Sequence, residues 1–185
     1  MKTKHLLIAF AVTALIQLSV PAKMIYDCEI TARQGTEYKF KAEPVDPNDP
    51  FRGKYITLSF SMENLTTKDT TWLAGETAYI ALAKDSLGFA KAAGLSRKKP
   101  ETDYITTEIF YKITDTEVRV KLPFDRYYME ESKAPEAETA YGEYAGRQDY
   151  KPVYALVGVK DGNAVLKDVI IDGMPIKDYV VKKRK

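Results

Sequence analysis

The sequence predicts a mainly β (α+β) domain, an antiparallel β-barrel or sandwich of about eight strands with one packed helix, preceded by an N-terminal transmembrane helix. Three observations lead to this class. Most segments after residue 36 alternate apolar and polar residues, which is typical of strands with one wet face. Turn signals such as Asp161-Gly162 separate neighbouring segments. Strands and helices do not alternate along the chain, which argues against a parallel α/β sheet.

The N-terminal segment is basic at its start and apolar over residues 6–20. Two interpretations stay open. A cleavable signal peptide would end at residues 20–22, before Lys23. An uncleaved anchor would run on through Tyr26, giving about 20 residues, enough to cross the hydrocarbon core of a bilayer. Under either interpretation the basic end stays in the cytoplasm and the remainder is exported.

We therefore divide the chain into a membrane anchor or signal peptide (residues 1–27), a single β-rich extracytoplasmic domain (28–176) and a basic tail (177–185). The chain has 28 basic and 26 acidic residues, and three of the basic ones lie in the leader. The remainder is close to neutral and carries no electrostatic footprint for nucleic acid. The basic tail is expected to be a solvated end of the chain.

Cysteine and histidine usage excludes several kinds of site. Cys28 is the only cysteine and His5, in the leader, is the only histidine. The domain therefore has no intramolecular disulfide and no thiolate metal cluster. A serine or cysteine nucleophile has no histidine partner in the domain, and zinc has no histidine ligand. We expect neither a metal nor a cofactor.

The first expected strands are short and separated by polar loops. Residues 37–42 alternate, and a proline-rich loop at 44–50 follows. Residues 55–60 form a strand with one apolar face made by Ile56, Leu58 and Phe60. The next two strands, residues 77–84 and 89–95, meet at a turn over residues 85–88.

The second half of the chain predicts two hairpins and a helix. Residues 104–113, with Ile105, Ile109, Tyr111 and Ile113 on one side, pair with residues 117–122. Residues 153–160 and 164–171 flank the Asp161-Gly162 turn, and a second such turn stands at Asp172-Gly173. Between the hairpins, residues 135–146 are expected to form the helix. The helix is expected to bury one stripe, made by Ala137, Ala140, Tyr141 and Tyr144. An aromatic layer is expected beside it, made by Tyr127, Tyr128, Tyr141 and Tyr144.

Residues 43–60 carry a recognisable pattern. A frame of prolines and aspartates leads into Gly53, Tyr55, Leu58 and Phe60. This stretch resembles the GDYXXLXY proteins, a bacterial envelope family of unknown function, although Lys54 stands in place of the signature's Asp and Phe60 in place of its last Tyr. Residues 122–131 and 162–173 also resemble the family, so that the resemblance extends over residues 5–176. It implies an uncleaved anchor and, often, a multi-spanning membrane protein encoded nearby, and it implies no activity.

The proline-rich loop contains the first candidate site. Asp46, Asn48 and Asp49 gather hard oxygens, which suits calcium. An EF-hand loop would need Gly at its sixth position and Glu at its twelfth, where Phe51 and Thr57 stand. A structural turn, with Asp side chains capping backbone N–H groups, is therefore favoured over a metal site. Gly53, at the exit of this loop, is expected to hold a backbone geometry that other residues avoid.

A second group of charges contains Asp125, Arg126, Glu130 and Glu131, interleaved with aromatic residues. Paired carboxylates beside an aromatic wall would suit acid and base catalysis of the glycosidase kind. The alternatives are a strand end with local ion pairs, or a surface for a ligand or partner. Our hypothesis is that Asp46, Asp49 and Arg52 come near this second group and form one polar cluster at an end of the barrel.

Three functions follow from these observations. The first is a non-enzymatic accessory domain, tethered to the bacterial inner (cytoplasmic) membrane by a single pass, that binds another envelope protein from the periplasmic side. The second is a carboxylate-based enzyme that uses Asp125, Glu130 or Glu131. The third is a barrel that binds a small apolar or sugar ligand. A deep pocket with two converging carboxylates would favour the enzyme, and a filled barrel with an exposed apolar patch would favour the accessory domain.

Overall fold

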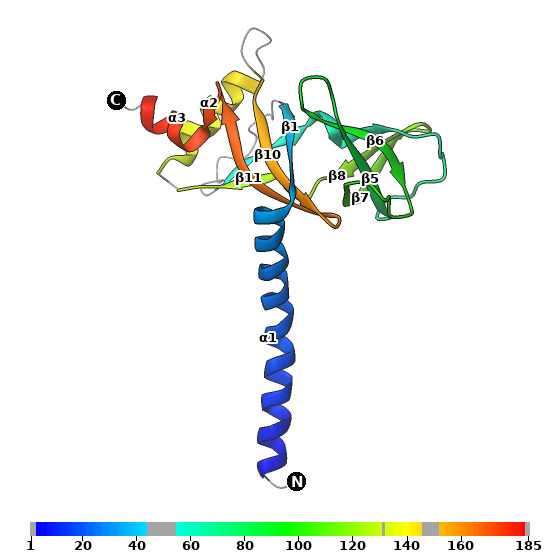
Figure 1. Ribbon diagram of the computed structural model, residues 1–185, viewed down its shortest axis with the longest axis vertical. Helices are drawn as coiled ribbons and strands as arrows, with labels where there is room; N and C mark the ends of the chain where they lie inside the picture. Colours follow the sequence, from blue (N-terminus) through cyan, green and yellow to red (C-terminus); the bar gives the residue numbers. More distant parts are fainter. Residues whose placement is uncertain (1–2, 44–54, 131, 146–151, 184–185) are drawn as a thin grey trace.

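The computed structural model describes residues 3–43, 55–130, 132–145 and 152–183. Antiparallel sheets make up most of the chain, and a long helix leaves the β-rich body at its N-terminus (Figure 1). One of the sheets is rolled into a nearly closed barrel. The predicted class, mainly antiparallel β with a packed helix and a preceding apolar helix, is therefore confirmed.

The first sheet has the strand order β12-β11-β10-β1-β3 and is antiparallel throughout. The hairpin between β10 and β11 turns at Asp161 and Gly162, whose φ angles are 50° and 84°. Positive φ at both positions suits the right-handed twist of the two strands, as an Asp-Gly turn predicts. The strands are β1 (Thr36–Glu43), β3 (Ser59–Phe60), β10 (Tyr154–Lys160), β11 (Asn163–Ile171) and β12 (Met174–Pro175).

The second large sheet has the order β4-β8-β7-β5-β6, and its neighbouring strands are again antiparallel. A 3₁₀ turn, η1 (Ser61–Glu63), carries the chain from β3 into this sheet. A separate two-stranded sheet joins β2 (Tyr55–Thr57) to β9 (Arg126–Tyr128). The strands of the second large sheet are β4 (Asn64–Thr66), β5 (Thr77–Lys84), β6 (Ala90–Ser96), β7 (Tyr104–Thr114) and β8 (Glu117–Lys121).

Two helices pack against each other next to β11 and β12 of the first sheet (Figure 1). The predicted helix is present as α2 (Ala134–Ala145), and its stripe at Ala137, Ala140 and Tyr141 is buried. The second helix, α3 (Ile176–Lys183), covers most of the segment that was expected to be a solvated tail. Two apolar side chains one helical turn apart, Ile176 and Val180, anchor it to the body.

Helix α1 (Thr3–Gln34) extends well beyond residue 27, where the anchor was expected to end. Its 32 residues span about 48 Å at 1.5 Å per residue. Among the described residues it is the one helix long and apolar enough to cross a membrane, by length and composition, and a signal sequence would pass the same test. Its apolar side chains, from Leu6 to Tyr26, are exposed.

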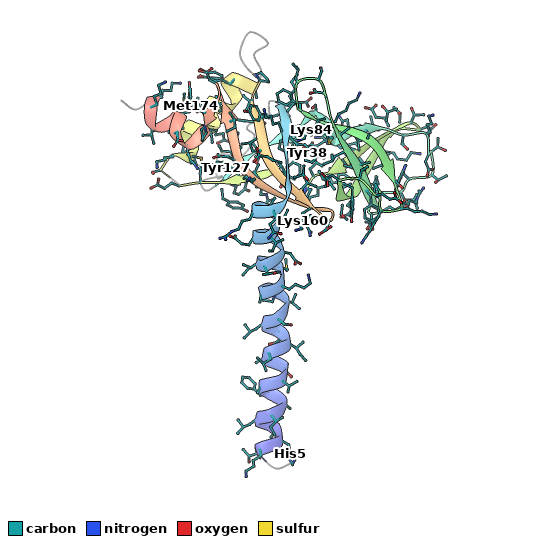
Figure 2. All side chains as sticks on the ribbon, in the orientation of Figure 1. His5, Tyr38, Lys84, Tyr127, Lys160 and Met174 are labelled. Atoms are coloured by element: carbon teal, nitrogen blue, oxygen red, sulfur yellow. The ribbon has the colours of Figure 1, made fainter. Side chains whose placement is uncertain are left out.

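The last turn of α1 is packed against the first sheet rather than joined to it by a linker. Thr31 is buried there, and its carbonyl oxygen accepts a hydrogen bond from the Gly35 N–H at 3.0 Å. Gly158 of β10 passes so close that a Cβ at this position would lie 2.7 Å from the same oxygen. Lys160 donates to the Gln34 side chain at 2.8 Å, and Figure 2 shows Lys160 where the helix meets the sheet.

The two large sheets share one apolar core. Its centre is an aromatic cluster in which Phe124 lies 4.8 Å from Phe40 and 5.2 Å from Phe60, measured between ring centroids. Polar contacts join the sheets at the rim, where the Tyr38 hydroxyl of β1 donates to Asp103 at 3.0 Å. Lys84 of β5 lies over the Tyr38 ring, 4.9 Å from its centroid.

The predicted strand at residues 55–60 is two strands in the structure. Ile56, Leu58 and Phe60 are all buried, as expected from their alternation. The Leu58 N–H, however, donates to the Asp125 carbonyl at 2.8 Å, and the chain then leaves β9 for the edge of the first sheet. The apolar face is thus continuous although the pairing partner changes.

Two other predictions were wrong. Tyr111 and Ile113 of β7 are 42% and 41% exposed, because bulges after Ile109 and after Lys112 shift the register with β8. The expected aromatic layer is dispersed: Tyr128 is exposed beside Tyr55, whereas the Tyr144 ring contacts a tyrosine of α3. The strands β4, β9 and β12, of two or three residues each, were not predicted because they are too short to show a periodicity.

Candidate functional site

The candidate site is built on the pairing of β2 with β9. Tyr55 stands opposite Tyr128 and Thr57 opposite Arg126. Because the partners are antiparallel and adjacent, their side chains on one face lie within contact distance of each other. The Tyr55 and Tyr128 rings are 5.5 Å apart between centroids. The short ribbon therefore displays two tyrosines and an arginine at one place.

Arg126 lies over this aromatic pair. Its guanidinium carbon is 5.1 Å from the centroid of the Tyr55 ring, within the range of a cation–π contact. A hydrogen bond with Tyr128, followed by the charges of Tyr55 and Asp125, raises the pKa of the Arg126 guanidinium above its ordinary value. The group is exposed and permanently charged, so it is available to an anionic or planar partner.

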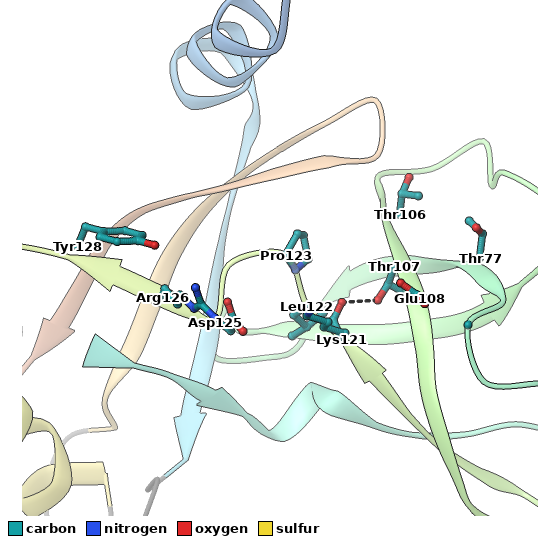
Figure 3. A pocket seen from close by; sticks show the side chains of 11 residues that line it. Thr77, Thr106, Thr107, Glu108, Lys121, Leu122, Pro123, Asp125, Arg126 and Tyr128 are labelled. Carbon is teal, nitrogen blue, oxygen red and sulfur yellow. Dashed lines mark hydrogen bonds between the residues drawn. The ribbon is translucent and has the colours of Figure 1, made fainter. Parts of the chain in front are cut away.

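Arg126 also borders a cleft, an open hollow of about 770 Å³ (Figure 3). Its wall is polar: Thr77 and Thr106 supply hydroxyl groups, and Thr107 donates to the Lys121 carbonyl at 2.7 Å. Two carboxylates and two cations line it, namely Glu108, Asp125, Lys121 and Arg126. Such a surface can hold a polar ligand or a polar segment of another protein through charge and hydrogen bonds.

Of the six predicted binding residues, two line the cleft, one does not, and three are not among the described residues. Asp125 and Arg126 both line the cleft. Glu130 does not line it: its carboxylate is 2.5 Å from the Lys133 ammonium, and its carbonyl accepts the N–H groups of Lys133 and Ala134 at the start of α2. The remaining predicted residues, Asp46, Asp49, Arg52 and the motif glycine Gly53, lie outside the described residues, as does the calcium hypothesis for this loop.

The described residues of the family-like motif divide between cleft and core. Tyr55 is half-buried beside the cleft and contacts Tyr128, which lines it. Leu58 and Phe60 are 2% and 1% exposed and belong to the core. The motif strand thus leads from the cleft into the centre of the body within six residues.

A second polar group was not predicted. Glu63 of η1 is buried and 2.6 Å from Arg119, and it also accepts the Phe60 N–H at 3.2 Å. Burial acts to lower the pKa of Arg119, but the hydrogen bond and charge of Glu63 outweigh it and raise the pKa. The pair borders a smaller hollow of about 330 Å³ that shares Asp125 with the first cleft. Because 56 residues separate Glu63 from Arg119, only the β4–β8 pairing brings them together.

The described residues contain no group of three or more His, Cys, Asp or Glu side chains placed to hold a metal ion. Cys28 is free and exposed on α1. The chemistry that the cleft displays is therefore that of carboxylates, cations, hydroxyls and aromatic rings.

These observations define the class of protein: an antiparallel β body with a polar cleft, carried on an N-terminal helix of membrane-spanning length. The family model described as "GDYXXLXY protein" matches residues 17–169, and the chain belongs to this family. The match begins within α1 and ends within β11. No match to a curated protein or to a solved structure was found.

Proposed function

We propose that this chain is a membrane-tethered accessory domain of the bacterial envelope, held in the inner membrane by a single pass, with its β body on the periplasmic side. We also propose that it binds a multi-spanning membrane protein of the same envelope. The observation that carries the proposal is the junction of α1 with the first sheet, where Thr31 packs on Gly158.

The chemistry of α1 supports a span followed by a short stalk. Its apolar portion reaches Tyr26 and contains one charge near that end, Lys23, which is paired with Asp27; a second ion pair, Arg33 with Glu29, follows in the last turns. Exposed apolar side chains along the first part suit hydrocarbon, and the ion pairs suit the aqueous boundary. The basic residues at the N-terminus favour a cytoplasmic start.

A tether of this kind restricts where the body can reach. A flexible linker would let the domain sample a wide volume, whereas a continuous helix packed on the sheet holds it at a fixed height above the bilayer. Ligands in bulk solvent do not require that restriction. A neighbouring membrane protein does benefit from it, because both partners are already confined to the same plane and their effective concentration is high.

The single cysteine allows a direct test of topology. Cys28 should react with a membrane-impermeant maleimide in intact spheroplasts, and the labelled protein should remain in the membrane after an alkaline carbonate wash. Intact-mass analysis of membrane-extracted protein should show the leader still attached. A mature chain that begins at Lys23, or protection of Cys28 until the cells are lysed, would end the proposal.

The cleft supports a second candidate, in which the body binds a small polar or sugar ligand or acts as a carboxylate-based enzyme. Asp125 and Arg126 line a hollow of about 770 Å³ together with Glu108. In this version Asp46, Asp49 and Arg52 would join Asp125, Arg126 and Glu130 in one polar cluster. Arg126→Lys keeps the charge but loses the paired N–H geometry, so it should impair binding while the melting temperature stays unchanged. Equal loss of folding would mark the cluster as structural.

A further inference from the structure

The two edge strands of the second large sheet face each other across a gap, and β1 reaches one end of it through an isolated bridge between Lys39 and Phe89, the residue before β6. β4 and β6 stand at opposite ends of the strand order. Residues of both strands nevertheless line the same two grooves, of about 250 and 230 Å³, and Leu65 of β4 and Ala92 of β6 border both. Rolling of the sheet has therefore brought its first and last strands side by side. Within the part of the chain that the structure describes, no backbone hydrogen bond joins them.

Strand direction explains why the gap stays open. Each neighbouring pair in this sheet is antiparallel. Direction therefore alternates along the five strands, and the two edge strands, β4 and β6, run the same way. One additional strand, antiparallel to both edges, would complete a fully antiparallel barrel of six strands, in which every ladder has the more favourable geometry.

The side chains around the gap leave room for such a strand. On the β6 side they are small, and a Cβ placed at Gly94 would meet nothing within 4 Å. On the inner side Leu65 and Met62 are each only 7% exposed. Since successive side chains of a strand point to opposite faces, an inserted strand would direct alternate apolar side chains to this core and the others to solvent.

One charged residue lines the two grooves, Lys91, and it is exposed. None of the residues that line the two grooves is acidic. Acidic side chains on the solvent face of an inserted strand would therefore be complementary to Lys91.

We propose that the gap between β4 and β6 is a binding site for an extended polypeptide strand in which apolar and acidic side chains alternate, and that this strand enters antiparallel to both edges. Such a strand gains backbone partners on two sides, whereas edge-to-edge pairing with a second copy would satisfy only one edge. The site is separate from α1 and from the Arg126 cleft. This proposal therefore goes beyond the tethering function, and a test of one does not decide the other.

The test uses the full chain in detergent micelles and a blocked eight-residue peptide that alternates valine with glutamate. Amide hydrogen exchange should slow in both β4 and β6 when the peptide is added. The N–H groups of alternate peptide residues point to opposite neighbours. N-methylation of the odd residues and N-methylation of the even residues should therefore each abolish binding. Unchanged binding of either methylated peptide, or protection of β6 alone, would overturn the proposal.

Charge provides the matched comparison. Lys91→Glu should weaken binding of the valine–glutamate peptide by about fivefold, whereas Lys182→Glu, at an exposed position of α3, should leave it unchanged. A peptide that alternates valine with lysine should bind wild type more weakly. Equal effects of the two variants would remove the charge argument. The protein could instead dimerise in a concentration-dependent way without peptide, with the same amides protected in the dimer. That result would show that the edge strands pair with a second copy, and it would overturn the peptide site.

Discussion

Gly158 lies in β10 where the strand passes beneath the last turn of α1, and the Gly158→Ala variant tests whether this contact is a rigid joint. The added Cβ would lie 2.7 Å from the Thr31 carbonyl oxygen, whereas ordinary contacts begin at 3.4 Å. The helix end or the strand must therefore move by about 0.7 Å in a close-packed site. Overpacking of this kind costs about 1–3 kcal/mol. We expect a loss of stability of that size, at about 2–4 °C in Tm per kcal/mol.

The assay is thermal unfolding of the full chain in detergent, combined with amide hydrogen exchange over the last turn of α1 and over β10. Exchange should accelerate at Thr31 and its neighbours if the helix end detaches. Gly142→Ala is the matched control, because a Cβ on this exposed glycine of α2 meets nothing within 4 Å. It should be neutral or stabilising by about 0.5–1 kcal/mol. A Gly158→Ala protein with wild-type Tm and wild-type exchange would refute the rigid joint.

Three further predictions concern the body. Burial and the Asp103 hydrogen bond raise the pKa of Tyr38 to about 12, whereas an unfolded tyrosine titrates near 10. The unfolded state therefore loses this proton first as the pH rises, and the free energy of unfolding measured in urea should fall between about pH 10 and 12. The fall should be less steep in Tyr38→Phe. Tyr141→Phe removes the donor to the Glu43 carbonyl and should cost about 1–2 kcal/mol by the same assay, unless water takes its place. EDTA and reductant should leave Tm unchanged, and a drop of several degrees with EDTA alone would favour the calcium hypothesis for Asp46 and Asp49.

Elements with a strong local signal could be predicted from the sequence. β5 was expected over residues 77–84 and occupies Thr77–Lys84, because its alternation is regular along its whole length. The Asp161-Gly162 turn was predictable because few residue pairs accept positive φ twice in succession. α3 was missed because the basic residues at its end dominated the interpretation, although the spacing of Ile176 and Val180 is a helical signal.

Features that depend on distant pairing could not be predicted in this way. The Glu63–Arg119 ion pair exists because β4 lies beside β8, and neither residue carries a local sign of its partner. The cleft likewise requires β9 and the end of β8 to lie near β5 and the first half of β7. Asp125 and Arg126 were selected from the local pattern of charged and aromatic residues. The charges that accompany them in the cleft, Glu108 and Lys121, come from strands whose register only the fold determines.

The family motif shows how local and distant constraints meet in one strand. Its two aromatic positions, Tyr55 and Phe60, are chemically alike in the signature but differ in surroundings here. Tyr55 is half-buried, with Arg126 over its ring, so its hydroxyl can be hydrated. Phe60 is 1% exposed and its ring contacts those of Phe40 and Phe124, where a hydroxyl would need a buried partner. The replacement of the signature's last tyrosine by phenylalanine therefore suits the core, whereas the same change at Tyr55 would remove a hydroxyl from the ring that lies under Arg126.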